Sequence, residues 1–140
     1  MRTVVAHGRY LIRAGLRALL TERNCGVEIL EARDSGELEA ALARDQNVDL
    51  LLIDIDLPGL GGFGGLQTIH AEHSDVPIMA IGASDHEADI TLAIKGGARG
   101  YVPEASSGDV FVNAIELVLS GSTYLPAPVA TTPAASEKRP

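Results

Sequence analysis

Four ionisable side chains follow short apolar runs of the sequence. His7 comes directly after the first run, Asp54 and Asp56 end the third, and Glu104 follows the fifth. A carboxylate can attack a phosphoryl donor or bind a cation, and an imidazole can bind a metal ion. Because the carboxyl ends of parallel strands meet at one edge of a sheet, we expect these side chains to share a pocket there, together with Arg9.

The apolar pattern predicts five strands that alternate with five helices. The strand-like runs are residues 3–6, 27–29, 48–53, 76–81 and 98–102, and the helical stripes are residues 11–20, 38–42, 63–73, 90–97 and 110–118. Asp34 or Ser35, Ser84 or Asp85, and Ser106 or Ser107 are suitable N-caps for the second, fourth and fifth helices. Regular alternation with short connections predicts an α/β fold, a doubly wound parallel sheet with helices on both faces.

Composition excludes several classes of protein. The chain has 140 residues with 11 Lys and Arg, 19 Asp and Glu, and a formal charge of −8, whereas a nucleic-acid-binding domain needs a basic face. The single cysteine, Cys25, excludes an internal disulfide and a cysteine-built zinc site. No apolar run is long enough to cross a bilayer, and the N-terminus lacks a signal-peptide pattern. We expect a cytoplasmic domain that binds neither nucleic acid nor membrane by itself.

Arginines recur every four residues at Arg9, Arg13 and Arg17, so a helix over these residues would carry a basic stripe. Residues 1–23 hold five Arg and one Glu, whereas residues 24–120 hold 17 acids and four bases. Two interpretations are open. The stripe is either a solvated helix face that offsets an acidic domain or a docking edge for an acidic partner.

Three stretches, residues 11–20, 49–62 and 96–102, resemble the receiver domain of bacterial two-component response regulators, and most closely the NarL/LuxR type of transcription regulator. The likeness runs from about residue 2 to 125. It implies a flavodoxin-like receiver fold with strand order 2-1-3-4-5, a regulatory and not an enzymatic role, and DNA binding through a separate domain. It also implies that Asp54 occupies the phosphoacceptor position and that Tyr101 is the aromatic residue that rotates with the state of the site.

The surrounding positions depart from that family's pattern. Receivers place two acids that hold Mg²⁺ after the first strand, Ser or Thr after the fourth and Lys after the fifth, and these positions here hold His7, Gly8, Gly82 and Glu104. Imidazole and glycine supply no carboxylate oxygen to Mg²⁺. A phosphoryl group would be repelled by the Glu104 carboxylate. We expect Mg²⁺ binding to be lost or weak, no cofactor to be held, and the domain to be an atypical receiver.

Positive charge in the pocket must then come from elsewhere. Asp54, Asp56 and Glu104 raise one another's pKa unless a cation compensates them, and His7 and Arg9 are the nearest candidates in the sequence. An internal ion pair without metal is the interpretation we adopt. A transition-metal site formed by His7, Asp54 and Glu104 is the alternative, because zinc accepts these ligand types.

Two other functions remain as alternatives. One is a conventional phosphorelay receiver that is phosphorylated on Asp54. The other is a nucleotide-binding enzyme, because residues 59–64 fit a G-x-G-x-x-G pattern after a strand. That motif expects an acid at the end of the next strand to hold a ribose, and Gly82 lies there instead. We therefore expect a flexible loop and no enzyme.

The last segment differs in composition from the rest. From residue 123 the chain is rich in Pro, Ala and Thr, so we predict a receiver domain at 1–122 and a flexible linker at 123–140. We expect the sequence to be a fragment of a longer protein whose DNA-binding domain is absent from these residues. We expect a homodimer that acts through dimerisation, a protein partner or a small ligand. Its interface would use either the first and fifth helices, with Arg13 and Arg17 near Glu116, or the fourth helix, fifth strand and fifth helix.

Overall fold

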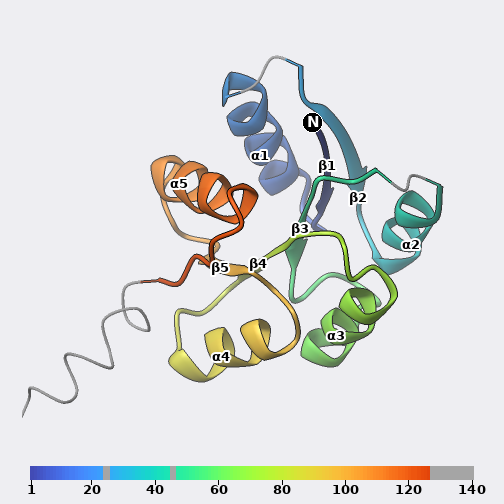
Figure 1. Cartoon of the computed structure of the whole chain (residues 1–140), viewed down its shortest axis with the longest axis vertical. Coiled ribbons are helices and arrows are strands. Elements are labelled where there is room, and N and C mark those ends of the chain that lie inside the picture. The colour runs from blue at the N-terminus through green and yellow to red at the C-terminus, as the bar shows by residue number, and fades with distance from the viewer. Residues whose placement is uncertain (24–25, 45–46, 127–140) are drawn as a thin grey trace, which may run out of the picture.

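The five apolar runs form the strands of one parallel sheet in the order β2-β1-β3-β4-β5, which confirms the predicted doubly wound fold (Figure 1). The computed structural model describes residues 1–23, 26–44 and 47–126. The strands are β1 (Arg2–Ala6), β2 (Glu28–Ala32), β3 (Leu50–Asp54), β4 (Ile78–Gly82) and β5 (Gly100–Pro103). The helices are α1 (Tyr10–Arg23), α2 (Ser35–Arg44), α3 (Gly62–Glu72), α4 (Glu87–Lys95) and α5 (Gly108–Leu119).

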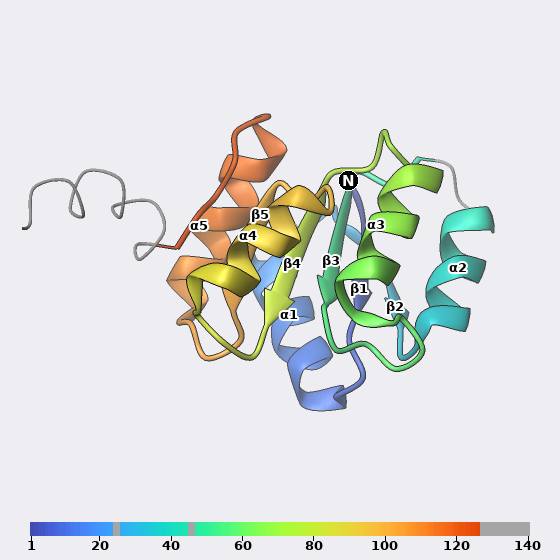
Figure 2. The same cartoon turned by 90° about the horizontal axis from the view of Figure 1, so that it is seen from below.

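The sheet separates two apolar layers, because successive side chains of a strand point to opposite faces. In β3, Leu50 and Leu52 pack with α1 and α5, whereas Leu51 and Ile53 pack with α2, α3 and α4. Figures 1 and 2 show these two groups of helices on opposite sides of the sheet. Every residue of β3 is buried, which explains its nearly continuous apolar sequence.

Side-chain caps begin two of the helices as predicted. Asp34 Oδ1 accepts a hydrogen bond from the backbone N–H of Glu37 at 2.8 Å, and Ser107 caps α5. The predicted cap of α4 is wrong. His86 precedes that helix without a side-chain cap bond, and the Ser84 hydroxyl instead donates to Asp89 Oδ2 at 2.5 Å.

The chain after α5 continues the sheet. Tyr124 forms a parallel bridge with Gly100 on the outer edge of β5, and Leu125 packs against the core. Ordered packing therefore extends past residue 122, where the sequence predicts the domain boundary. Residues 127–140 and Cys25 lie outside the described part of the chain.

Within the residues that the structure describes, every helix is too short or too polar to cross a membrane.

Candidate functional site

The register of the strands brings three of the four ionisable residues to one edge of the sheet. Ala6 of β1 pairs with Ile53 of β3, so His7 and Asp54 are the next residues at the carboxyl ends of neighbouring strands. Glu104 follows β5 directly. One ligand atom from each of His7, Asp54 and Glu104 lies within 4.8 Å of the others.

Asp54 ends β3 and is 7% exposed. Its Oδ1 accepts a hydrogen bond from the backbone N–H of Asp56 at 3.0 Å. Burial raises the pKa of the Asp54 carboxyl. The Asp56 N–H and the nearby His7 ring lower it, and the carboxylates of Asp56 and Glu104 raise it, with a net rise. The ionised form of Asp54 is therefore held at a cost.

His7 links the two carboxylates. It is 1% exposed, and its Nε2 lies 2.7 Å from Glu104 Oε1 and 3.4 Å from Asp54 Oδ2. The other ring nitrogen, Nδ1, accepts a hydrogen bond from the backbone N–H of Arg9 at 3.1 Å. An amide N–H is only a donor, so Nδ1 carries a lone pair and the ring proton is on Nε2. His7 is thus a neutral hydrogen-bond donor to Glu104.

Arg9 supplies the positive charge of the pocket. Its Nη1 forms an ion pair with Glu104 Oε2 at 3.1 Å, although the Arg9 side chain is 67% exposed. Both donors to Glu104, His7 and Arg9, come from the segment between β1 and α1. His7 and Arg9 therefore hold the Glu104 carboxylate beside Asp54. Of these two expected positive partners, only Arg9 is charged.

The donor set is a poor one for Mg²⁺. The position after His7 is Gly8, where an added Cβ would lie 3.1 Å from Pro58 Cδ, so a carboxylate side chain has little room there. Mg²⁺ in proteins is held by one or two carboxylates together with water. The cluster offers the carboxylates of Asp54 and Glu104, but the two Glu104 oxygens are already bonded to His7 and Arg9, so Mg²⁺ would compete with these partners.

A transition metal also fails to fit this arrangement. A metal-bound histidine donates its second ring N–H to an acceptor, whereas Nδ1 of His7 faces the N–H donor of Arg9. Coordination through Nε2 would place two protons against each other at Nδ1. The geometry therefore favours the ion-pair interpretation of this pocket over the zinc alternative.

Tyr101 lies on β5 and is 1% exposed. Its hydroxyl donates to the carbonyl oxygen of Ser84 at 2.6 Å. A Cβ added to Gly82 would lie 1.8 Å from that hydroxyl oxygen, so the phenol occupies space that a side chain at position 82 would need. Burial raises the pKa of the Tyr101 phenol, with the hydrogen bond to Ser84 acting in the opposite direction.

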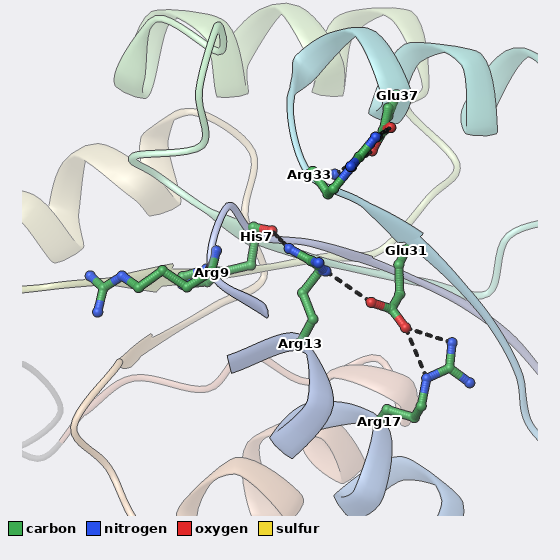
Figure 3. Close-up of polar contacts among 7 residues, drawn as sticks. All are labelled: His7, Arg9, Arg13, Arg17, Glu31, Arg33 and Glu37. Carbon is green, nitrogen blue, oxygen red and sulfur yellow. Dashed lines mark hydrogen bonds and ion pairs between the residues drawn. The ribbon is translucent and has the colours of Figure 1, made fainter. Parts of the chain in front are cut away.

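Neither interpretation of the arginine stripe describes Arg13. It is 7% exposed, and Figure 3 shows it between the carbonyl oxygen of His7 and Glu31. Arg13 Nη1 donates to the His7 oxygen at 2.8 Å and Arg13 Nε to Glu31 Oε1 at 2.8 Å, while Arg17 holds Glu31 Oε2. Burial acts to raise the pKa of Glu31, but hydrogen bonds from Arg17 and Arg13 outweigh it and lower that pKa. Within one chain Glu116 forms an ion pair with Arg23, and the expected approach of Arg13 and Arg17 to Glu116 across a dimer interface stays a prediction.

Sequence reasoning missed Arg13 and Glu31 as supports of the site. The available signal was the spacing of Arg13 to Leu16 and Leu20, three and seven residues later, which places Arg13 on the buried side of α1. The partner, Glu31, lies at the exposed edge strand β2 and has no comparable pattern.

Local backbone structure explains the glycines that follow β3. Gly59 and Gly61, two of the three glycines of the motif, have φ +83°, and a Cβ at Gly59 would lie 2.5 Å from Ser35 Oγ. These positions need glycine for backbone conformation and close approach, so the G-x-G-x-x-G match requires no phosphate to explain it.

Comparison with known proteins gives a consistent result. A family profile described as "Response regulator receiver domain" matches residues 4–116. The chain is 27% identical over 138 residues to the Glycerol metabolism activator of Pseudomonas putida, which covers 99% of this chain and 62% of that protein. It is 28% identical over 125 residues to Response regulator GacA of Pseudomonas viridiflava, which covers 89% of this chain and 58% of that protein. The chain thus spans about 60% of the length of these two relatives.

A solved structure agrees with them. The two-component response regulator of the LuxR family from Aurantimonas sp. SI85-9A1 has a TM-score of 0.84 and 27% sequence identity, over 99% of this chain and 98% of that one.

Proposed function

This chain belongs to the response regulator receiver domain family, a family of regulators and not of enzymes, and we propose that it is an atypical member whose output does not need magnesium-dependent phosphorylation of Asp54. The observation that carries this proposal is the hydrogen bond from His7 Nε2 to Glu104 Oε1 at 2.7 Å, beside Asp54. The Glu104 carboxylate already accepts from His7 and Arg9, the donors that a bound phosphoryl group would need.

Charge explains why phosphorylation would be unfavourable. A phosphoryl group on Asp54 adds roughly 1.5 to 2 negative charges at neutral pH. That phosphoryl group would be repelled by the nearby Glu104 carboxylate. The charged donor beside it is Arg9, whose side chain is largely exposed, so solvent and salt weaken its attraction to an anion. No cofactor is part of the proposal.

A direct test uses a small phosphodonor. The protein is incubated with acetyl phosphate and Mg²⁺, and its intact mass is measured over time beside Asp54→Asn and beside a conventional receiver as positive control. We expect the positive control to gain a phosphoryl group and this chain to keep its mass. A stoichiometric adduct that is lost in Asp54→Asn would instead establish the conventional phosphorelay function.

We further propose that the module regulates transcription through its surface in a cytoplasmic regulator, with DNA bound outside these residues. Relatives named as response regulators and an activator support a regulatory role. The net charge of −8 opposes direct DNA binding by this domain.

Self-association through α1 and α5 is the form of output that we propose. Leu11 is 80% exposed and Leu119 is 40% exposed at opposite ends of this face. Apolar hollows of about 290 Å³ and 180 Å³ adjoin these two residues, between α1 and α5. Exposed leucines beside apolar hollows favour a protein partner, and a second copy of the chain is the one we propose. The outer edge of β5, which belongs to the competing face, is already covered by Tyr124.

A further inference from the structure

Among the described residues, no strand pairs with the outer edge of β2. This strand ends the sheet on the side of α2, as Figure 1 shows. The carbonyl oxygen of Ala32 accepts a hydrogen bond from the His7 N–H at 3.0 Å, so Ala32 faces β1. Because successive residues of a strand direct their backbone groups to alternate sides, Ile29 and Glu31 direct theirs outward. They present the N–H and C=O groups of a free sheet edge.

A hollow of about 460 Å³ adjoins this edge, between β2 and α2. Leu30, Ala40 and Ala41 give it an apolar wall, and Leu30 is only partly buried although it packs against the core. We call this hollow, together with the neighbouring edge of Ile29 and Glu31, the β2 groove. It joins main-chain groups to an apolar pocket, the two features by which a sheet edge binds an extended peptide. Charged side chains complete its lining, namely Arg13, Glu31, Arg33, Glu37 and Arg44.

The β2 groove carries positive charge, although the chain as a whole has a formal charge of −8. Arg13 and Arg17 share the single carboxylate of Glu31 (Figure 3), so this cluster keeps an excess of positive charge. Arg44 adds to that excess, because it is exposed and forms no ion pair with the residues that the structure describes. The other arginine and the other glutamate of the groove bind each other. The chemistry that complements this surface is therefore acidic.

We propose that the β2 groove binds an acidic, extended segment of a partner protein, which adds to the sheet as a strand beside β2. The outward backbone groups of β2 pair with that segment. Its apolar side chains contact Leu30 and Ala40, and its carboxylates meet Arg17 and Arg44. The interaction does not depend on how Asp54 is used, and it lies at the opposite end of the sheet from β5.

A synthetic peptide of this chemistry tests the proposal. The probe alternates Glu with Val over about six residues, an ordinary strand length, and its ends are capped. Its dissociation constant is measured from chemical-shift changes of the protein's backbone amides, at low salt and at about 1 M salt, where charge attraction is screened. We expect the shift changes to centre on Ile29 and Glu31, and we expect binding to weaken about tenfold in high salt.

Two charge reversals provide a matched comparison. Arg44→Glu places an acid in the β2 groove, whereas Lys95→Glu makes the same change of charge in the last turn of α4. We expect Arg44→Glu to weaken peptide binding about tenfold, because it replaces an attraction by a repulsion. Lys95→Glu should change binding less than about twofold, since salt screens distant charges. Both positions are exposed, so both variants should keep the fold.

Modified peptides separate backbone pairing from simple charge attraction. N-methylation of alternate residues keeps every carboxylate but removes N–H donors, and replacement of Glu by Lys reverses the charge. We expect both changes to abolish binding. The proposal is overturned if the wild type binds the Glu–Val peptide more weakly than about 1 mM, or if the N-methylated peptide binds equally well. Equal dissociation constants for Arg44→Glu and Lys95→Glu would overturn it too.

Discussion

His7 and Glu104 lie 97 residues apart in the sequence and share a hydrogen bond of 2.7 Å at the carboxyl end of the sheet. The bond joins the segment after β1 to the segment after β5, across the end of β3 where Asp54 lies. Because Nδ1 of His7 is occupied by the Arg9 N–H, the imidazole contributes a donor and not a charge. Glu104 therefore places a carboxylate beside Asp54 that only the Arg9 guanidinium offsets with charge.

Substitution of Glu104 measures how far the pocket depends on that anion. Glu104→Lys would leave the buried His7 N–H with Asp54 at 3.4 Å and place a cation beside Arg9. We expect a loss of about 1–3 kcal/mol in the free energy of unfolding, the cost of an unsatisfied buried donor. Glu104→Gln keeps an acceptor and should lose less.

Urea unfolding gives these values, and Arg9→Ala is the control, with an expected change below about 1 kcal/mol because Arg9 is largely exposed. A Glu104→Lys protein as stable as the wild type would show that His7 does not depend on Glu104.

Asp54→Asn should stabilise the protein at neutral pH. The pKa of Asp54 is raised in the folded state, chiefly by burial. The folded state then binds more protons than the unfolded state once the pH exceeds about 3.9, the ordinary Asp value, so stability falls as pH rises from there through the folded pKa. Removing the carboxyl removes that loss.

The measurement is the free energy of unfolding of wild type and Asp54→Asn at pH 3 and pH 7. We expect the variant's advantage to be present at pH 7 and to shrink at pH 3. An equal difference at both pH values would contradict the assigned pKa shift.

Arg13 and Arg17 bind the same carboxylate with different burial. Arg13 is buried and also holds the carbonyl oxygen of His7, whereas the Arg17 side chain is 48% exposed. We expect Arg13→Ala to cost about 2–4 kcal/mol, because it leaves buried acceptors and removes packing, and Arg17→Ala to cost less than about 1 kcal/mol.

Thermal or urea unfolding of the two variants decides this comparison. The pKa of Glu31 is lowered by its two arginine partners, so their contribution is present above the ordinary Glu pKa and is lost as the pH falls through the folded value. Equal losses in Arg13→Ala and Arg17→Ala would mean that burial of Arg13 contributes nothing.

The two candidate faces for self-association can be separated with one leucine on each. Leu11 lies on α1 and is 80% exposed, and Leu92 lies on α4 and is 47% exposed. Since a charge in an apolar interface is strongly unfavourable, we expect Leu11→Glu to weaken the dimer at least tenfold and Leu92→Glu to leave it unchanged.

Sedimentation velocity over a range of protein concentrations measures the dissociation constant of each variant. If Leu92→Glu raised the dissociation constant and Leu11→Glu did not, the dimer interface would lie on the face of α4 instead. A wild-type protein that stays monomeric at all concentrations would remove self-association from the proposed function.

The amino-acid sequence by itself determined the fold and the location of the site. Apolar periodicity reflects burial of each residue on its own strand or helix, and parallel strands place their carboxyl ends together, so Asp54, His7 and Glu104 were expected in one place. The resemblance to receiver domains implied, in addition, that Gly82 stands where a hydroxyl is expected and Glu104 where a cation is expected.

Only the tertiary structure decided which of these groups meet. The neutral state of His7 follows from a backbone N–H of Arg9, the burial of Arg13 from a partner on an edge strand, and the position of Tyr101 from empty space at Gly82. Such contacts depend on side-chain conformations and on hydrogen bonds between segments distant in sequence. The apolar periodicity of the sequence does not predict such contacts, because it describes each helix or strand separately.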